Sequence, residues 1–273
     1  MPIPDLSEVG LADLISLRGR VAVVTGGGAG IGASIGHRLG EAGAAVAVLD
    51  YNTVAAESTA TAIAQRYDVQ TVSVPVDVKD EQAVTAAAAT VMRELGDLHI
   101  WVNNAGAYPS ASALDLSADG WDDLLNLNLR AVFVGAREAA KLIIAQKHGG
   151  VIINIASTAA FKAGGGNAVH YVASKHGVAG LTKQLAFEWG PHNIRVVAIA
   201  PTLTMETPGI KEKQDWLDSV GYGSVLADYA ASLPLGRAAM PDDVARLVLF
   251  AASDLATLVS GSMLFADAGD MTK

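Results

Sequence analysis

Tyr171 and Lys175 stand four residues apart in a segment with a helical pattern, which runs from Tyr171 to Trp189. Residues four apart on a helix lie on the same side, so the phenol and the ammonium group face the same space. An ordinary tyrosine has a pKa of about 10 and rarely exchanges its proton at neutral pH. Because a neighbouring ammonium group stabilises the phenolate, we expect it to lower the pKa of Tyr171 toward the range of a general acid or base. The alternative is a pair that meets by chance on a helix surface.

A glycine-rich segment, Thr25-Gly26-Gly27-Gly28-Ala29-Gly30-Ile31-Gly32, follows the aliphatic run Val21 to Thr25 and opens a helical pattern. Glycines allow positive φ angles and let the backbone approach a ligand closely. The amino end of the helix offers unpaired N–H groups and the positive end of the helix dipole. This context predicts a site for the pyrophosphate of a dinucleotide, whereas a tight glycine turn is the simpler alternative.

Asp50 ends the second aliphatic run, 20 residues after Gly30. A carboxylate at this place accepts hydrogen bonds from both ribose hydroxyls of NAD and repels the 2′-phosphate of NADP. The next residues, Tyr51 and Asn52, supply no positive charge for that phosphate. We therefore predict NAD as the cofactor; the alternative role for Asp50 is a cap of the following helix.

Five motifs in order resemble the short-chain dehydrogenase/reductase family, over roughly Arg18 to Gly269. They are the glycine pattern Thr25 to Gly32, the element Asn103-Asn104-Ala105-Gly106, Asn128, Ser157 and the pair Tyr171-x-x-x-Lys175. The resemblance implies an oxidoreductase that transfers a hydride between a nicotinamide and a secondary alcohol or its ketone. Any one of these motifs alone would be weak support, whereas the full order at the family's spacing is specific.

The resemblance also assigns the catalytic residues Asn128, Ser157, Tyr171 and Lys175. Tyr171 would take the alcohol proton during oxidation and return it during reduction, and Ser157 would hold the substrate oxygen by a hydrogen bond. Lys175 would also bind the nicotinamide ribose, and Asn128 would position a water that links Lys175 to solvent. Taken singly, Ser157 is also typical of a turn residue and Asn128 of a helix cap.

The expected cofactor contacts follow the ends of successive strands. Asp77 resembles the family's adenine-side aspartate, with an N-cap as the alternative. The family commonly has Pro-Gly after the sixth strand, where this chain has Pro201-Thr202, and Thr204 and Thr207 both suit the nicotinamide amide. The predicted cofactor-binding residues are Gly26, Gly30, Ile31, Gly32, Asp50, Tyr51, Asp77, Val78, Asn104, Ala105, Gly106, Tyr171, Lys175, Pro201, Thr202 and Thr204.

Strands that are apolar throughout alternate with helical patterns, which predicts a parallel sheet covered on both faces. With right-handed crossovers, this gives an α/β fold: one doubly wound, Rossmann-type sheet flanked by helices, in a single domain over residues 1–273. The expected strands are Val21–Thr25, Ala44–Asp50, Thr71–Val76, His99–Asn103, Val151–Ala156 and Ile194–Ala200. Helices are expected over Ala55–Tyr67, Glu81–Leu95, Ala118–Gln146 and Tyr171–Trp189.

Two segments fall outside this alternation. The N-terminal extension, residues 1–17, carries Leu6, Val9, Leu14, Ile15 and Leu17 and is expected to form a short amphipathic packing helix. Residues 202–237 form an insertion after the carboxyl end of the sixth strand, where doubly wound folds bind ligands. The insertion is expected to act as a substrate lid, although a plain surface excursion is equally compatible with its sequence.

Composition limits the partners. Lys and Arg total 19 against 28 Asp and Glu, and the resulting net charge of −9 disfavours binding to nucleic acid. The chain has no cysteine, and its six histidines lack metal-ligand spacing, so no catalytic metal is expected. No export signal or membrane-spanning run is recognised, which favours a cytoplasmic location. The two longest predicted helices are apolar on more than one face, which is consistent with subunit packing. Members of the family that the chain resembles are commonly dimers or tetramers, so we expect a homodimer or homotetramer.

Two other functions stay open beside an NAD-dependent alcohol dehydrogenase. One is an NADPH-dependent 3-oxoacyl thioester reductase, against which stand Asp50 and the lack of a basic patch for an acidic carrier protein. The other is a non-catalytic, dinucleotide-sensing regulator, which predicts loss of the catalytic residues that this chain retains. Among substrates, sugar alcohols, hydroxysteroids and small hydroxy esters all fit the sequence.

Overall fold

The computed structural model describes residues 5–164 and 166–272. Its centre is a seven-stranded sheet in the order β3-β2-β1-β4-β5-β6-β7, in which every neighbouring pair is parallel. The strands are β1 (Val21–Thr25), β2 (Ala45–Asp50), β3 (Thr71–Pro75), β4 (Ile100–Asn103), β5 (Gly150–Ile155), β6 (Ile194–Pro201) and β7 (Met263–Ala266). The predicted fold class is confirmed, and the bounds of β1 to β6 agree with the predicted ones to within one residue, whereas no bounds were predicted for β7.

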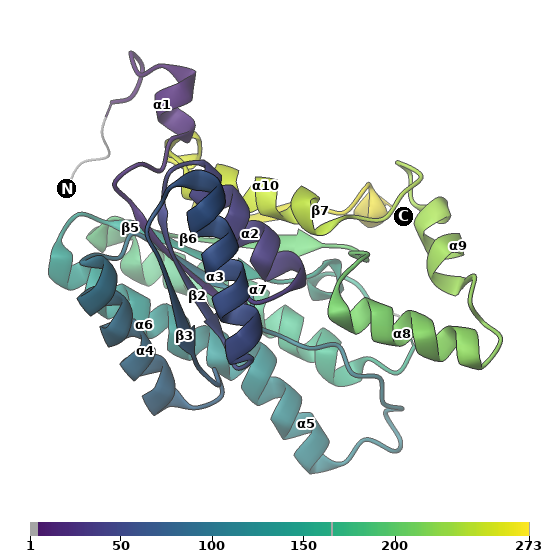
Figure 1. Cartoon of the computed structure of the whole chain (residues 1–273). Coiled ribbons are helices and arrows are strands. Elements are labelled where there is room, and N and C mark those ends of the chain that lie inside the picture. Colours follow the sequence, from purple (N-terminus) through teal and green to yellow (C-terminus); the bar gives the residue numbers. More distant parts are fainter. Residues whose placement is uncertain (1–4, 165, 273) are drawn as a thin grey trace.

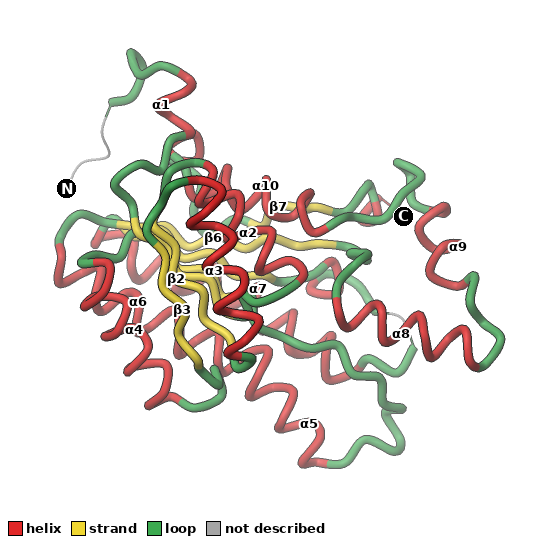
Figure 2. Tube along the Cα trace, viewed as in Figure 1, coloured by secondary structure: helices red, strands yellow, loops and turns green. Residues whose placement is uncertain are grey.

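Helices cover both faces of the sheet (Figures 1 and 2). On one face, α2 (Gly30–Glu41), α3 (Thr53–Tyr67) and α10 (Pro241–Ala252) share one hydrophobic core with the sheet. On the other face, α4 (Glu81–Leu95), α6 (Ala131–Gln146) and α7 (Val169–Trp189) pack around Trp101, which is fully buried. The central strands β1, β2, β4, β5 and β6 are therefore buried on both faces, which explains their largely apolar sequences, whereas the edge strands β3 and β7 are only partly buried.

Strand order reverses between β1 and β4, and ligands of doubly wound folds bind beyond the carboxyl ends of the strands at such a switch point. The loops after β1, β2, β3, β4, β5 and β6 meet at this end of the sheet. Together with the last residues of β2 and β6, they hold every residue predicted for catalysis or cofactor binding except those on α2, α7 and Asn128. The fold thus positions the predicted site at one edge of the molecule.

One predicted helix, Ala118–Gln146, contains a local irregularity. It is divided into α5 (Ala118–Leu125), a π-helical turn at Asn126–Arg130, and α6. A π turn inserts an extra residue into a helix and is often found at functional sites. Asn128 lies inside this turn and is completely buried.

The N-terminal prediction needs correction. Helix α1 covers only Leu11–Ile15, and its Leu11 is 71% exposed. Leu17, beyond the helix, is fully buried, and its backbone N–H donates to the Ala42 carbonyl at 2.8 Å. A segment of five residues gives too few hydrogen bonds to sustain an independent amphipathic helix, so the extension packs through Leu17 instead. Residues 1–4 of this extension lie outside the described residues.

The insertion folds into two helices, α8 (Pro208–Ser219) and α9 (Val225–Ser232). Both lie beyond the carboxyl end of the sheet, on the same side as the C-terminus (Figure 1). Within the described part of the chain, no helix combines the length and the apolar character needed to cross a membrane.

Candidate active site

The glycine-rich segment forms the turn from β1 into α2. Gly26 has φ +61°, and a Cβ atom there would lie 2.9 Å from the Cα of Ala105. The loop is thus packed directly against the loop after β4, and only glycine fits. Helix α2 begins at Gly30, and no side chain among the described residues caps its amino end. Its first N–H groups therefore remain available for an anion such as a pyrophosphate.

Asn104 joins these two loops. Its Nδ2 donates to the carbonyls of Thr25 and Gly26, at 3.0 Å each. In return, the hydroxyl of Thr25 accepts the backbone N–H groups of Asn104 and Ala105 at 3.0 and 3.1 Å. Asn104 thus fixes the shape of the glycine loop, a role that the motif alone did not reveal.

Asp50 is almost buried at the end of β2. Its Oδ2 accepts the backbone N–H of Gly28 at 2.9 Å, and its Oδ1 accepts that of Asn52 at 2.9 Å. Asn52, not Asp50, caps α3. The capping alternative for Asp50 is therefore wrong, and the carboxylate lies beside the glycine loop. Tyr51, the next residue, is 83% exposed.

Asp77 lies after β3 and is exposed, and its Oδ1 accepts the backbone N–H of Lys79 at 2.9 Å. The N-cap of α4 is Asp80, whose side chain accepts from Gln82 and Ala83. The capping alternative for Asp77 is wrong as well. Val78, its neighbour, is half-buried beside the same strand end.

Asn128 connects the π turn to the loop after β4. Its Nδ2 donates to the Ala107 carbonyl at 2.8 Å, and its Oδ1 accepts the Ala107 N–H at 3.0 Å. A Cβ atom on Gly106 would lie 3.0 Å from the same Oδ1. Asn128 is therefore a clamp on the segment that follows Asn103-Asn104-Ala105-Gly106, rather than the cap that was the alternative.

Ser157, Tyr171 and Lys175 come together between β5 and α7. The Ser157 hydroxyl accepts the Ala159 N–H at 3.1 Å and donates to the Pro201 carbonyl at 3.5 Å, and it lies near enough to the Tyr171 phenol to act on its pKa. Lys175 is buried, and its Nζ donates to the Ile155 carbonyl at 2.9 Å and lies 5.6 Å from the centre of the Tyr171 ring. The pair Tyr171 and Lys175 is thus not a chance surface pair.

The expected direction of the Tyr171 pKa is wrong for this structure. Burial raises the pKa of the Tyr171 phenol, and the nearby Ser157 hydroxyl opposes this only in part. Burial also lowers the pKa of the Lys175 ammonium to about 8. The spacing rule did not include the loss of solvent around both groups, which disfavours the phenolate and the ammonium group alike.

In the loop after β6, the threonine hydroxyls are hydrogen-bonded within the protein. The Thr202 hydroxyl donates to Asp270 Oδ2 at 2.8 Å, and the Thr204 hydroxyl donates to the Thr202 carbonyl at 3.1 Å. Thr207 lies beside the glycine loop, because a Cβ atom on Gly30 would be 3.5 Å from the Thr207 Cβ. Of the two threonine candidates, Thr207 is the one that borders the predicted pyrophosphate site.

Asp270 was missed by the sequence interpretation. It is 2% exposed, and its carboxylate accepts from Thr202, from the Tyr229 hydroxyl at 2.9 Å and from Lys162 Nζ at 2.5 Å. These partners belong to the loop after β6, to α9 and to the loop after Ser157. The C-terminal turn therefore fastens three segments around the site, and no local sequence pattern signals such an arrangement.

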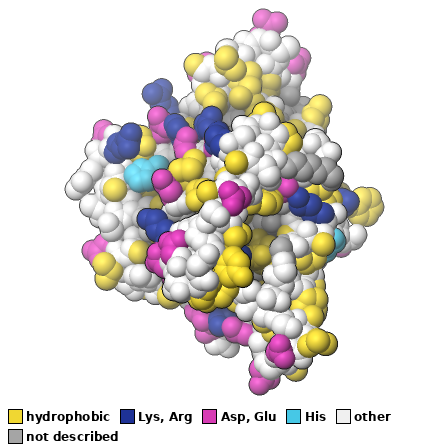
Figure 3. Space-filling view, turned by 90° about the vertical axis from the view of Figure 1, so that its right-hand side faces the viewer, with side chains coloured by type: hydrophobic (Ala, Val, Ile, Leu, Met, Phe, Trp, Pro, Cys, Tyr) yellow, Lys and Arg dark blue, Asp and Glu magenta, His cyan; other side chains and the backbone are white. Residues whose placement is uncertain are grey.

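Side chains from the loop after β4 and from the insertion lie near Tyr171. The Tyr108 ring meets the Tyr171 ring edge-on, with 4.5 Å between centroids. Lys213 of α8 lies over Tyr108, whereas Trp216 and Tyr222 of the insertion are 60% and 64% exposed. On the face of the molecule seen from the right of Figure 1, hydrophobic side chains and charged side chains of both signs are interspersed (Figure 3).

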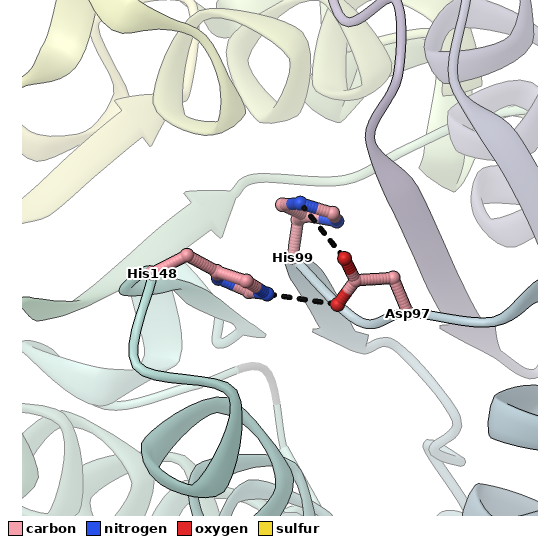
Figure 4. A group of neighbouring side chains, drawn as sticks. All are labelled: Asp97, His99 and His148. Carbon is pink, nitrogen blue, oxygen red and sulfur yellow. Dashed lines mark hydrogen bonds and ion pairs between the residues drawn. The ribbon is translucent and has the colours of Figure 1, made fainter.

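A histidine cluster lies at the opposite, amino end of the strands. Asp97, His99 and His148 place their ligand atoms within 4.8 Å of one another (Figure 4). However, the Val21 N–H donates to His99 Nδ1 at 3.1 Å, so the proton of the neutral ring is on Nε2, which then has no lone pair for a metal. His148 Nε2 lies 2.8 Å from Asp97 Oδ1. We interpret the cluster as a hydrogen-bonded tie between loops, remote from the candidate active site.

Comparison with known proteins agrees with this geometry. The model of a family described as Enoyl-(Acyl carrier protein) reductase matches residues 26–270. The chain is 37% identical to 2-dehydro-3-deoxy-D-gluconate 5-dehydrogenase of Escherichia coli, over 93% of this chain and 96% of that protein.

Solved structures extend the likeness. A short-chain type dehydrogenase/reductase from Mycobacterium marinum is 30% identical, with a TM-score of 0.88 over 95% of this chain and 98% of its own. Carveol dehydrogenase from Mycobacterium avium, solved in complex with NAD, is 29% identical, with a TM-score of 0.88 over 94% and 99% of the two chains. The sheet, the site geometry and these likenesses confirm the resemblance read from the motifs: the chain belongs to the short-chain dehydrogenase/reductase family.

Proposed function

We propose that this oxidoreductase transfers a hydride between NAD and a secondary alcohol or its ketone, with Tyr171 as the general acid and base. One observation carries the proposal. The Tyr171 phenol has the Ser157 hydroxyl near it and the Lys175 ammonium group 5.6 Å from its ring centre, at the strand ends where the uncapped α2 helix begins. Proton transfer and dinucleotide binding are thereby available at one place.

Each residue of the site has its own part in the proposed reaction. A bound nicotinamide supplies or accepts the hydride. Ser157 donates a hydrogen bond to the substrate oxygen and keeps it next to the Tyr171 hydroxyl, which takes or returns the proton. Lys175 holds the nicotinamide ribose and stabilises the phenolate. Asn128 positions a water that passes protons from Lys175 to solvent, and its clamp on Ala107 supports this role by fixing the nearby loop.

A nicotinamide dinucleotide fits the loops around the switch point. The N–H groups at the start of α2 suit the pyrophosphate, and the loops after β2, β3 and β4 suit the adenosine half. We further propose NAD over NADP. Asp50 supports this choice, because its carboxylate lies against the Gly28 N–H and would meet the 2′-phosphate of NADP with like charge.

The remaining expectations are also proposals. The insertion, residues 202–237, acts as a substrate lid, supported by its contacts with Tyr108 and with the glycine loop. Exposed Phe133 on α6 and Phe187 on α7 support assembly into a homodimer or homotetramer. A cytoplasmic location is compatible with the absence of cysteines from the sequence.

The 3-oxoacyl thioester reductase and the non-catalytic regulator are less well supported. The first needs NADPH and a surface for an acidic carrier, whereas Asp50 and the net charge of −9 oppose both. The second predicts a decayed catalytic group, whereas Ser157, Tyr171 and Lys175 are in contact or close to one another.

The test is the appearance of reduced nicotinamide when the protein is given NAD and a panel of secondary alcohols, sugar alcohols, hydroxysteroids and hydroxy acids. We expect turnover with at least one class, and we expect Ser157→Ala to lower kcat by about 100-fold while NAD still binds. Binding of NAD without turnover on any substrate class would favour the regulator. Turnover that requires NADPH and an acyl thioester would favour the reductase.

A further inference from the structure

Lys213 belongs to α8 of the insertion and reaches back toward the catalytic group. Its Nζ lies over the Tyr108 ring, 4.6 Å from the ring centre. The Tyr108 ring in turn meets Tyr171 edge-on at 4.5 Å. Tyr108 therefore contacts both the ammonium group of Lys213 and the ring of the proposed general acid and base.

The cation of Lys213 has no protein anion to neutralise it. Among residues 5–164 and 166–272, none forms an ion pair or a hydrogen bond with its Nζ. Lys213 is half-buried, and this burial lowers the pKa of its ammonium group. By contrast, Lys162 on the neighbouring loop is paired with Asp270. A partly desolvated cation without a partner is costly unless something else supplies the negative charge.

We propose that Lys213 binds a carboxylate of the substrate, so that the physiological substrate is a hydroxy acid or the corresponding keto acid. This inference rests on the proposed function, since it assumes that the reacting oxygen lies at Ser157 and Tyr171. The Tyr108 ring lies between the two ends of the substrate and contacts its carbon chain. The carboxylate then replaces the missing counter-ion of Lys213 when the substrate binds.

The side chains at this position, one ammonium group and one aromatic ring, favour a carboxylate over a phosphate as the bound group. A single ammonium group is a compact point charge that can balance one negative charge, and Lys213 is accompanied by an aromatic ring rather than by a cluster of cations. The short path through Tyr108 suits a small, short-chain or sugar-type acid, with its hydroxyl a few carbons from the carboxylate. A long neutral alcohol would leave the cation unpaired.

The competing explanation is a purely structural one, in which Lys213 stacks on Tyr108 and holds α8 in place. Both explanations predict some effect of removing Lys213 on lid position. Only charge recognition predicts that the effect depends on the charge of the substrate. The experiment therefore compares acids with uncharged molecules of nearly the same shape.

The probes are 3-hydroxybutyrate, 4-hydroxypentanoate and gluconate, each measured against its own primary amide with NAD. The variants are Lys213→Gln and Lys213→Arg, with Lys211→Gln on an exposed position of α8 as the matched control. We expect the wild-type protein to prefer at least one acid over its amide. Lys213→Gln should lower kcat/KM for that acid by about 10- to 100-fold and for the amide by less than about 3-fold. Lys213→Arg should restore much of the preference, and Lys211→Gln should keep all of it.

Two results would overturn the inference while leaving the proposed function intact. One is turnover of the amides or of neutral alcohols with no preference for any acid. The other is a preference for an acid that persists in Lys213→Gln. If no acid, amide or alcohol reduces NAD, the proposed function itself fails, and the inference falls with it.

Discussion

The ammonium group of Lys175 lies inside the protein and donates to the carbonyl of Ile155 at 2.9 Å, on the strand that leads to Ser157. This bond ties α7 to β5 and sets the position of Tyr171 one helical turn away. Among residues 5–164 and 166–272 no acidic group pairs with the Lys175 ammonium group, and burial lowers its pKa. The buried ammonium group of Lys175, which is proposed to support catalysis, therefore lowers the free energy of unfolding.

That cost should appear as a pH-dependent stability. The pKa of Lys175 is about 8 in the folded protein and 10.5 as its ordinary value, so between these values the unfolded chain binds a proton that the folded chain lacks. The free energy of unfolding therefore rises as pH rises through this window. Relative to Lys175→Met, which has no titrating group, the wild-type protein should gain about 1–3 kcal/mol between about pH 7 and pH 10. Denaturant unfolding of both proteins at each pH measures this gain, and a constant difference would contradict it.

The raised pKa of Tyr171 predicts how turnover depends on pH. Burial keeps the phenol protonated, which suits reduction, whereas oxidation needs the phenolate. Oxidation should therefore accelerate as pH rises from neutral to alkaline, while reduction should slow over the same range. Initial rates in both directions across this range test the assignment. An oxidation rate that falls as pH rises would assign the proton transfer to another group.

Asp50 should control the choice of cofactor. Asp50→Asn keeps an oxygen that can accept the Gly28 N–H but removes the negative charge that would face a 2′-phosphate. We expect the ratio of kcat/KM for NAD to that for NADP to fall by about 10- to 100-fold. Glu57→Gln, which changes an exposed charge on the neighbouring α3, should leave the ratio unchanged. A wild-type protein that uses both cofactors equally would contradict the proposal at once.

Asp270 should act on substrate binding through the loops that it fastens. Asp270→Asn keeps the size of the side chain but weakens its bonds to Lys162, Thr202 and Tyr229. We expect KM for the substrate to rise by about 3- to 10-fold with a smaller change in kcat, because the lid is held less firmly. Asp228→Asn, an exposed change on α9, is the control. A loss confined to kcat would indicate that Asp270 acts on the chemical step instead.

Much of the fold was predictable because its signals are local. The predicted bounds of α4 agree with the structure, since Asp80 caps its amino end and Gly96, with φ +80°, ends it. The order of the motifs likewise gave the strand ends at which the site forms. The sequence did not reveal the π turn, because its shape depends on contacts between Asn128 and Ala107, which is 21 residues away.

The parts of the site that could not be predicted depend on tertiary packing. Asp270 acquires its role from three segments that lie far apart in the sequence. The pKa of Tyr171 depends on how completely α7 and Tyr108 exclude solvent, which the four-residue spacing to Lys175 does not report. Lys213 contacts Tyr108 only because α8 lies beyond the sheet end. Each of these residues is ordinary in the sequence and becomes distinctive only in the folded chain.

Hydride transfer by Tyr171→Phe tests the central claim most directly. The variant keeps the ring that packs against Tyr108 and removes only the hydroxyl, and Tyr67→Phe at the end of α3 is the matched control. With NAD and the best substrate of the panel, we predict that Tyr171→Phe turns over about 1,000-fold more slowly at saturating NAD, while Tyr67→Phe resembles the wild-type protein. A Tyr171→Phe enzyme that keeps more than about a tenth of the wild-type rate would contradict the account.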